Sequence, residues 1–215
     1  GAIGAETLAR PESEDAVVVG SGAQGRAQLM GLSKVMPKLK KVGLFDVLDS
    51  SAEKMAEEVR SQYPGIKITA FPFASLEDHV RNADIIVTCT PSKKSFIKKD
   101  WLRKGSHINT IGADMPGKQE IDPWITANVR VFGDSRHQAA QKGECQHAVS
   151  AGLIKPDDIT EIGEVLNGTK PGRMSPDEIT MFDATGMALQ DLIAAKAALE
   201  RAEAQNIGTV VEMEQ

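Results

Sequence analysis

The feature that most constrains this 215-residue chain is a regular alternation of short apolar runs with helical patterns between about Glu14 and Phe132. The runs are rich in β-branched residues and continuously apolar, as in DAVVVG (15–20). Such strands are covered on both faces, and a β-α-β succession joins parallel strands by right-handed crossovers. The sequence therefore predicts an α/β fold with a doubly wound parallel sheet. We expect strands at 15–20, 41–47, 66–71, 84–90, 106–112 and 129–134, and helices at 22–35, 50–63 and 75–83.

The second half of the chain has a different pattern. Beyond residue 134 it is mostly helical, and the clearest helix is expected over 184–205. Gly208 is expected to end this helix, and TVVEM (209–213) predicts a short terminal strand. The apolar positions of the helix predict a broad buried stripe, made of Met187, Leu189, Leu192, Ile193, Ala195 and Leu199.

Charge and cysteine content narrow the classes of partner and location. The chain has 25 Lys and Arg against 30 Asp and Glu, a formal net charge of −5, which argues against a nucleic-acid or membrane partner. No stretch approaches the ~18 uncharged apolar residues of a membrane span. Cys89 and Cys145 are too few for a disulfide framework and predict a reducing, cytoplasmic location. The segment GECQH (143–147) has neither HExxH nor CxxC spacing, so no metal site is predicted.

The first predicted strand runs directly into Gly20-Ser21-Gly22-Ala23-Gln24-Gly25 and then into a helix, which is GxGxxG in the context that a dinucleotide site requires. Gly20 permits a tight turn, Gly22 lets the backbone approach a pyrophosphate, and Gly25 lets the helix pack closely on the strand. The free N–H groups and positive dipole end of the helix then face the phosphates. These features predict a Rossmann-type cofactor-binding domain over residues 1–183, followed by a C-terminal helix and strand over 184–215.

An acidic residue follows at the distance that such sites use. Asp46 ends the second predicted strand, about 20 residues after the glycines. A carboxylate there accepts hydrogen bonds from the adenosine ribose and repels a 2′-phosphate, so the sequence favours NAD over NADP as the cofactor. The alternative is a glycine turn and an unrelated solvated aspartate.

Two further loops follow predicted strands, at the edge where an open α/β sheet binds its ligand. The hydroxyls of Thr88-Cys89-Thr90-Pro91-Ser92 could line the cofactor or cap the next segment. The loop at 109–120 places Asp114 where the nicotinamide would lie. An aspartate there could act as a general acid or base, with its pKa adjusted by burial and by Lys118. On spacing alone, an Asx-turn residue ahead of Pro-Gly is equally compatible.

Long motifs along the chain resemble the ornithine cyclodeaminase/mu-crystallin family, especially its ornithine cyclodeaminase and archaeal alanine dehydrogenase members. They occur in the family's order from one end of the chain to the other. The motifs are LARP (8–11), GSGAQ (20–24), TPS (90–92), IGADMPGKQEID (111–122), GECQHAVSAGLI (143–154), GTKPGR (168–173) and FDATGMALQD (182–191).

The resemblance assigns roles to individual residues. Asp114 matches the family's catalytic aspartate, which handles protons of the amine and of the attacking water. The cofactor-binding positions are matched by Gly20, Gly22, Ala23, Gln24 and Asp46, to which the glycine spacing adds Gly25. Loops near the cofactor are matched by Thr90, Pro91, Gly112, Asp183 and Thr185.

The resemblance also implies the chemistry. Family members use NAD(H) or NADP(H) to oxidise an amino acid such as ornithine or alanine to an imine, with release of ammonia; others reduce imines or ketimines. The crystallin branch is instead a non-catalytic binder of NAD(P) or small ligands, and its members carry a non-acidic residue at the position of Asp114. The aspartate therefore favours an enzyme that acts on a small amino-acid substrate.

One departure from the family concerns length. Family members exceed 300 residues, and their first third is a separate substrate and dimerisation domain that contributes a lysine and arginines to the site. The resemblance places Gly1 inside the helix that links the two domains, so we expect this domain to be missing here. The 215 residues are then expected to bind NAD with little turnover alone. Their apolar surface around 1–8 and 184–213 is expected to be exposed or used in a new self-contact, whereas the full-length form is expected to be a homodimer.

Overall fold

Among residues 1–209 and 211, which the computed structural model describes, eight strands form one sheet in which every pair is parallel. The structure divides into two units, Gly1–Thr185 and Gly186–Gln215, and the sheet belongs to the first. In spatial order its strands are β3 (Lys67–Ala70), β2 (Lys41–Phe45), β1 (Asp15–Val19), β4 (Ile85–Thr88), β6 (His107–Thr110), β10 (Thr180–Asp183), β8 (Arg130–Gly133) and β9 (Thr160–Glu161).

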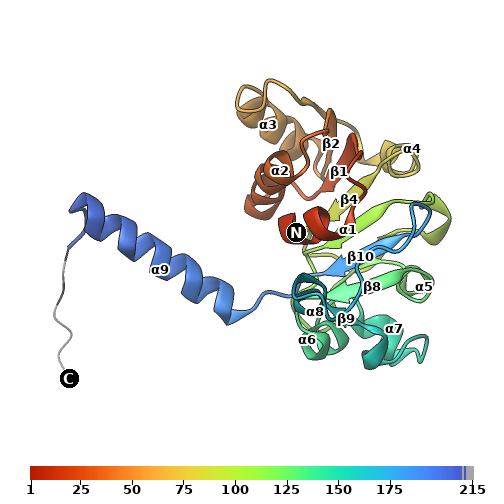
Figure 1. The fold of residues 1–215 in the computed structure, drawn as a ribbon. Coiled ribbons are helices and arrows are strands. Elements are labelled where there is room, and N and C mark those ends of the chain that lie inside the picture. The colour runs from red at the N-terminus through yellow and green to blue at the C-terminus, as the bar shows by residue number, and fades with distance from the viewer. Residues whose placement is uncertain (210, 212–215) are drawn as a thin grey trace. The chain divides into compact units, whose positions relative to one another are not determined.

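Helices cover both faces of this sheet (Figure 1). On one face, α2 (Ala23–Val35) and α3 (Asp49–Arg60) pack Leu29 and Met55 against Val18 and Leu44 of the strands. On the other face, α4 (Leu76–Val80) packs against Val17 and Phe45. The remaining helices of this unit are α1 (Ala2–Leu8), α5 (Pro123–Thr126), α6 (Arg136–Gln141), α7 (Gln146–Ser150) and α8 (Ile162–Leu166), with 3₁₀ turns at Phe73–Ser75, Lys99–Trp101 and Pro156–Asp158. The predicted doubly wound parallel sheet is confirmed.

Six strands of the sheet were expected, and each is present with its ends shifted by no more than about two residues, the uncertainty of any boundary. Two others, β10 and β9, were not expected, because the prediction left the chain beyond residue 134 mostly helical. That prediction is wrong for β10, which lies in the middle of the sheet between β6 and β8 and is buried at all four residues. Its sequence, TMFD, is too short and too polar at its ends to show a strand pattern. A separate pair of strands, β5 (Lys93–Ile97) and β7 (Gln119–Ile121), also escaped prediction.

The first helix packs on the core instead of exposing an apolar surface. In α1, Ala5 and Leu8 are fully buried, and a Cβ added to Gly4 would lie 2.4 Å from the Phe182 ring. The helix contacts α2, β6 and α8. Of the two alternatives expected for residues 1–8, exposure or self-contact, the structure shows self-contact, although Ile3 is 44% exposed.

The second unit contains α9 (Ala188–Gln205), which starts four residues later than predicted and ends at Asn206 in the left-handed conformation. The predicted buried stripe is wrong, because α9 has no buried residue: Leu189, Leu192, Ile193 and Leu199 are each more than half exposed. The strand expected at 209–213 falls mostly on residues outside the described part of the chain. No helix among the described residues is long and apolar enough to cross a membrane.

Candidate functional site

The strand order reverses between β1 and β4, and this is where an open α/β sheet has a crevice outside the carboxyl ends of its strands. From β1 the chain continues outward through β2 and β3, whereas β4 and β6 extend the sheet in the other direction. The loops that follow β1, β4 and β6 therefore meet at one edge. They contain the glycine segment 20–25, Thr90 and Pro91, and the Asp114 loop.

The glycine segment has the geometry of a tight turn into a helix. Gly20 has φ +107°, and a Cβ there would lie 2.6 Å from the Cys89 carbonyl oxygen. A Cβ on Gly25 would lie 2.0 Å from the Gly20 carbonyl oxygen, so helix α2 approaches the turn more closely than a side chain allows. Gly22, in contrast, has no atom within 4 Å of the place where its Cβ would stand. The backbone therefore faces open space at the second glycine alone of the three.

The amino end of α2 carries no side-chain cap. Gly22 is the N-cap residue, and the first intrahelical hydrogen bond runs from the Arg26 amide to the Gly22 carbonyl. The N–H groups of the first turn, which include those of Ala23, Gln24 and Gly25, precede this bond and so have no acceptor inside the helix. Amides of this kind, together with the helix dipole, form an anion-binding site.

Asp46 follows β2 and holds the glycine turn. Its Oδ2 accepts the Ser21 amide at 2.9 Å, and its Oδ1 accepts the Leu48 amide at 3.1 Å. The carboxylate is therefore fixed beside the glycine segment while remaining partly exposed. Arg26, which sequence reasoning missed, also binds this turn: its Nη1 donates to the Ser21 carbonyl at 2.5 Å, and the guanidinium pairs with Glu58.

Thr90 and Gly112 are brought together by a buried acid. Glu120 accepts the amide and the hydroxyl of Thr90, at 2.6 and 2.8 Å, and the amide of Gly112 at 2.9 Å. A Cβ on Gly112 would lie 2.3 Å from the Thr90 carbonyl oxygen, so only glycine lets the two loops approach this closely. The Thr90 hydroxyl proton is thus committed to Glu120, and the Thr90 hydroxyl oxygen accepts the Ser92 amide at 3.2 Å. Pro91, next to Thr90, is exposed.

Asp114 lies on the exposed part of the third loop. Its Oδ1 is 2.6 Å from the Lys118 ammonium, and its side chain is 51% exposed. The loop is held from behind by α7: Gln146 accepts the Gly117 amide at 2.8 Å, and the His147 Nε2 lies 2.7 Å from the Lys118 carbonyl oxygen. The GECQH segment therefore supports this loop, and no cluster of His, Cys, Asp or Glu fit for a metal occurs in the described part of the chain.

Asp183 and Thr185 occupy the end of β10 and the residues after it. Asp183 is the last residue of the strand and is fully buried; it accepts the amides of Glu144 and Cys145 at 3.1 and 3.0 Å. Burial raises its pKa to about 6. Thr185 is also buried, and its hydroxyl donates to Asp134 at 2.9 Å. Both side chains are directed at protein groups, so any role near a cofactor falls to the backbone around them.

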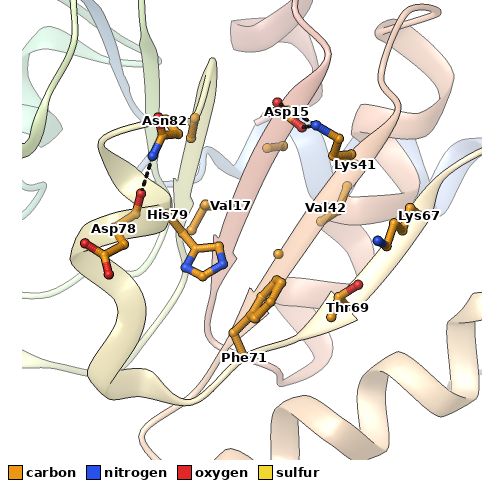
Figure 2. A pocket seen from close by; sticks show the side chains of 13 residues that line it. Asp15, Val17, Lys41, Val42, Lys67, Thr69, Phe71, Asp78, His79 and Asn82 are labelled. Atoms are coloured by element: carbon orange, nitrogen blue, oxygen red, sulfur yellow. Dashed lines mark hydrogen bonds and ion pairs between the residues drawn. The ribbon is translucent and has the colours of Figure 1, made fainter.

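A hollow in the first unit is lined by none of the predicted site residues. It has a volume of about 390 Å³ and lies over the amino-terminal halves of β1 and β2 and beside β3 (Figure 2). Phe71 and His79 form its wall, with ring centroids 4.0 Å apart. The hollow is at the opposite ends of the strands from Gly20 and Asp46.

The sheet order, the open glycine turn and the acid after β2 define the chain as a Rossmann-type α/β protein. It belongs to the ornithine cyclodeaminase/mu-crystallin family, whose sequence model matches residues 1–206.

Individual relatives lie close to the chain in sequence. The alanine dehydrogenase of Archaeoglobus fulgidus is 39% identical over 212 residues, a match that covers 98% of this chain and 64% of that protein. The iminosuccinate reductase of Paracoccus denitrificans is 35% identical over 201 residues, a match that covers 91% of this chain and 59% of that protein. The chain thus spans less than two thirds of the length of these relatives.

Solved structures show the same fold. An archaeal alanine dehydrogenase dimer with bound NAD matches with a TM-score of 0.92 and 39% identity, over 99% of this chain and 65% of that one. The Δ1-pyrroline-2-carboxylate reductase of Thermococcus litoralis, in complex with NADH and L-proline, matches with a TM-score of 0.92 and 30% identity, over 98% and 64%.

Proposed function

We propose that this chain is the NAD-binding part of an NAD-dependent amino-acid oxidoreductase or cyclodeaminase. The observation that carries the proposal is the open space at Gly22, in front of the uncapped amino end of α2, with Asp46 fixed beside it. That arrangement supplies unpaired N–H groups for a pyrophosphate and a carboxylate for a ribose. The relatives described above as NAD or NADH complexes support the choice of cofactor.

The residues divide into three groups around such a cofactor. Gly20, Gly22 and Gly25 with the amides of Ala23 and Gln24 would hold the pyrophosphate. Asp46 would hold the adenosine ribose. The backbone at Thr90, Pro91, Gly112, Asp183 and Thr185 would surround the remainder. NAD, when bound, supplies the acceptor for a hydride.

Asp114 is the proposed acid and base. It is exposed at the crevice edge and paired with Lys118, so it can exchange a proton with a bound amine or with water. This aspartate favours an enzyme over a non-catalytic binder. Relatives are named alanine dehydrogenase, iminosuccinate reductase and ornithine cyclodeaminase, and we propose an amino or imino acid as the substrate. By analogy with the archaeal dimer, the full-length protein is proposed to be a homodimer.

Titration of NADH fluorescence with the 215-residue chain tests cofactor binding. Saturable binding is expected for the wild type. Gly22→Ala should weaken binding about tenfold or more, because its Cβ enters the space proposed for phosphate, while stability stays nearly unchanged. Gly65→Ala is the matched control, since it also has no atom within 4 Å and lies away from the crevice. An unchanged signal at millimolar NADH would contradict the proposal.

The same titration with NADPH tests the role of Asp46. Asp46→Asn removes the charge that repels a 2′-phosphate, so the affinity for NADPH should rise relative to that for NADH. Turnover of the full-length protein with ornithine and alanine then separates the activities: proline without accumulated NADH identifies a cyclodeaminase, and pyruvate with NADH identifies a dehydrogenase.

A further inference from the structure

Three buried acidic side chains, those of Asp183, Glu144 and Glu120, form a series beside the proposed crevice. Asp183 binds the backbone of Glu144, and Glu144 binds the backbone of Glu120. Asp183 accepts the Glu144 amide at 3.1 Å. Glu144 accepts the amides of Glu120 and Ile121, at 2.9 and 2.8 Å. Glu120 in turn accepts amides from the loops that follow β4 and β6. The contacts run from the middle of the sheet to the loop that carries Asp114.

Burial and charge make this an unusual arrangement. The exposed fractions of Glu120, Glu144 and Asp183 are 0%, 1% and 0%. Among the described residues, no ion pair joins any of the three to a Lys, Arg or His. Burial raises the pKa of all three carboxyl groups, and the neighbouring acids add to this for Glu144. Burying a carboxyl group without a cation costs free energy of folding unless the group is hydrogen-bonded. The hydrogen bonds from the backbone amides offset that cost for these three residues.

Both oxygens of Glu120 are committed to fixed donors. Oε1 accepts the Thr90 amide, and Oε2 accepts the Gly112 amide at 2.9 Å. The hydroxyl of Thr90 donates to Oε1 and that of Thr88 to Oε2, each at 2.8 Å. A hydroxyl can rotate to become an acceptor, but a backbone N–H cannot. A carboxyl group, ionised or protonated, therefore fits this site, whereas an amide would place its NH₂ against a backbone N–H in either orientation.

The loop with Asp114 is held at both ends by the same part of the molecule. Gly112, two residues before Asp114, is bound by Glu120, and a Cβ there would lie 2.5 Å from the Glu120 carboxyl carbon. At the other end, Gln146 binds the Gly117 amide at 2.8 Å. Gln146 follows directly on Glu144 and Cys145, whose amides are held by Asp183. Between these two attachments Asp114 itself is exposed.

We propose that Glu120 is a positioning residue: it locks the Thr90 and Gly112 backbones together and so fixes the loop of Asp114 at the crevice, while Asp183 and Glu144 fix Glu120. The inference rests on the proposed function for its purpose, but the lock is a property of the chain without cofactor. An acid–base group must be held to within about 0.5 Å of its productive place, and an exposed loop needs such an attachment to achieve that.

Hydrogen exchange of individual amides, measured by NMR on the 215-residue chain without cofactor, tests the lock. Glu120→Gln should raise exchange at Thr90 and Gly112 about tenfold or more, as expected when a bond to a charged or buried group is lost. Exchange at Glu144 and Cys145 should stay unchanged, because Asp183 is their acceptor. A general loss of stability would instead raise exchange at all four amides, those of Glu144 and Cys145 included.

Glu164→Gln is the matched control. Glu164 also accepts a backbone amide, that of Glu161, but through Oε2 alone. A glutamine at this position can still accept that amide through its side-chain oxygen, so exchange at Glu161 should stay unchanged. Thr88→Val is a second, milder variant in case Glu120→Gln does not fold: it removes one donor to Oε2 and should raise exchange at Gly112 about threefold. Unchanged exchange at Thr90 and Gly112 in Glu120→Gln, unchanged exchange at Gly112 in Thr88→Val, or an equal rise at Val18 in β1 would overturn the proposal. NADH titration of the wild type is independent of these results, so failure of cofactor binding and failure of the lock can be told apart.

Discussion

At the scale of single residues, His107 shows how a buried polar side chain is satisfied inside the sheet. It is fully buried at the start of β6, with Nδ1 2.9 Å from the Thr180 hydroxyl oxygen and Nε2 3.1 Å from the Asn109 Oδ1. Burial lowers the pKa of His107 to about 3. The ring is therefore neutral in the folded protein at any pH where the protein is normally handled. In the unfolded chain, a histidine takes up a proton near pH 6.5.

Stability should therefore depend on pH through His107. Above pH 6.5 its contribution is fully present, and it is lost as the pH falls toward 3, by at most about 1.4 kcal/mol per pH unit for one proton. His107→Gln removes this dependence while keeping a neutral polar side chain. Urea denaturation between pH 4 and 7.5 should show the free energy of unfolding of the wild type falling more steeply toward acid than that of the variant.

Asp183 changes the pH dependence of stability in the opposite sense, so its contribution must be distinguished from that of His107. Its raised pKa, about 6, means that the folded state binds its proton more tightly, so stability from Asp183 is lost as the pH rises from about 4 to 6. Because Asp183 is present in both proteins, the difference between their profiles isolates His107. Parallel profiles would show that His107 is protonated in the folded state.

At the scale of elements, α1 is a helix that exists because of its packing. It has seven residues, no side-chain N-cap and no acidic residue in its first turn, and an isolated helix of this length is unstable in water. Leu8 meets Phe132, Ile162 and Phe182 in a cluster of its own. The packing of this one face thus determines the conformation of the segment.

Leu8→Ala should lower the free energy of unfolding by about 2–5 kcal/mol, since it leaves a cavity among these side chains. Ile3→Ala is the control on the same helix, because Ile3 is 44% exposed, and it should cost less than ~1 kcal/mol. Urea denaturation of the two variants measures both values. Equal effects would mean that the buried face does not hold the helix.

At the scale of the whole molecule, the two units differ in how they are stabilised. The three clusters of buried apolar residues lie entirely within Gly1–Thr185. In the second unit, α9 has no buried residue, so this unit has no buried apolar cluster among its described residues.

A chain ending at Thr185 should therefore keep the urea midpoint of the whole chain and its affinity for NADH. Circular dichroism should show only the helical signal of α9 removed. A fall in the free energy of unfolding of more than ~1 kcal/mol would show instead that residues after Thr185 stabilise the sheet.

The sequence by itself determined the parallel sheet, its first six strands and the position of the glycine turn and Asp46. These follow from local information: continuous β-branched runs, helical spacing, and glycines where a turn or a close approach excludes a Cβ. Asp114 and its loop were also found from sequence, because the loop follows a strand and the motif is long. The role proposed for each of these residues stays a prediction until the titrations are made.

Only the tertiary structure decided the rest, because it depends on contacts between residues far apart in the chain. The strand β10 forms from four residues that meet β6 and β8 on either side. The role of Glu120 follows only from its contacts with Thr90 and Gly112. That of Arg26 follows only from its hydrogen bond to the Ser21 carbonyl. A buried carboxylate becomes favourable when distant backbone amides converge on it, and no local pattern of residue types records that convergence.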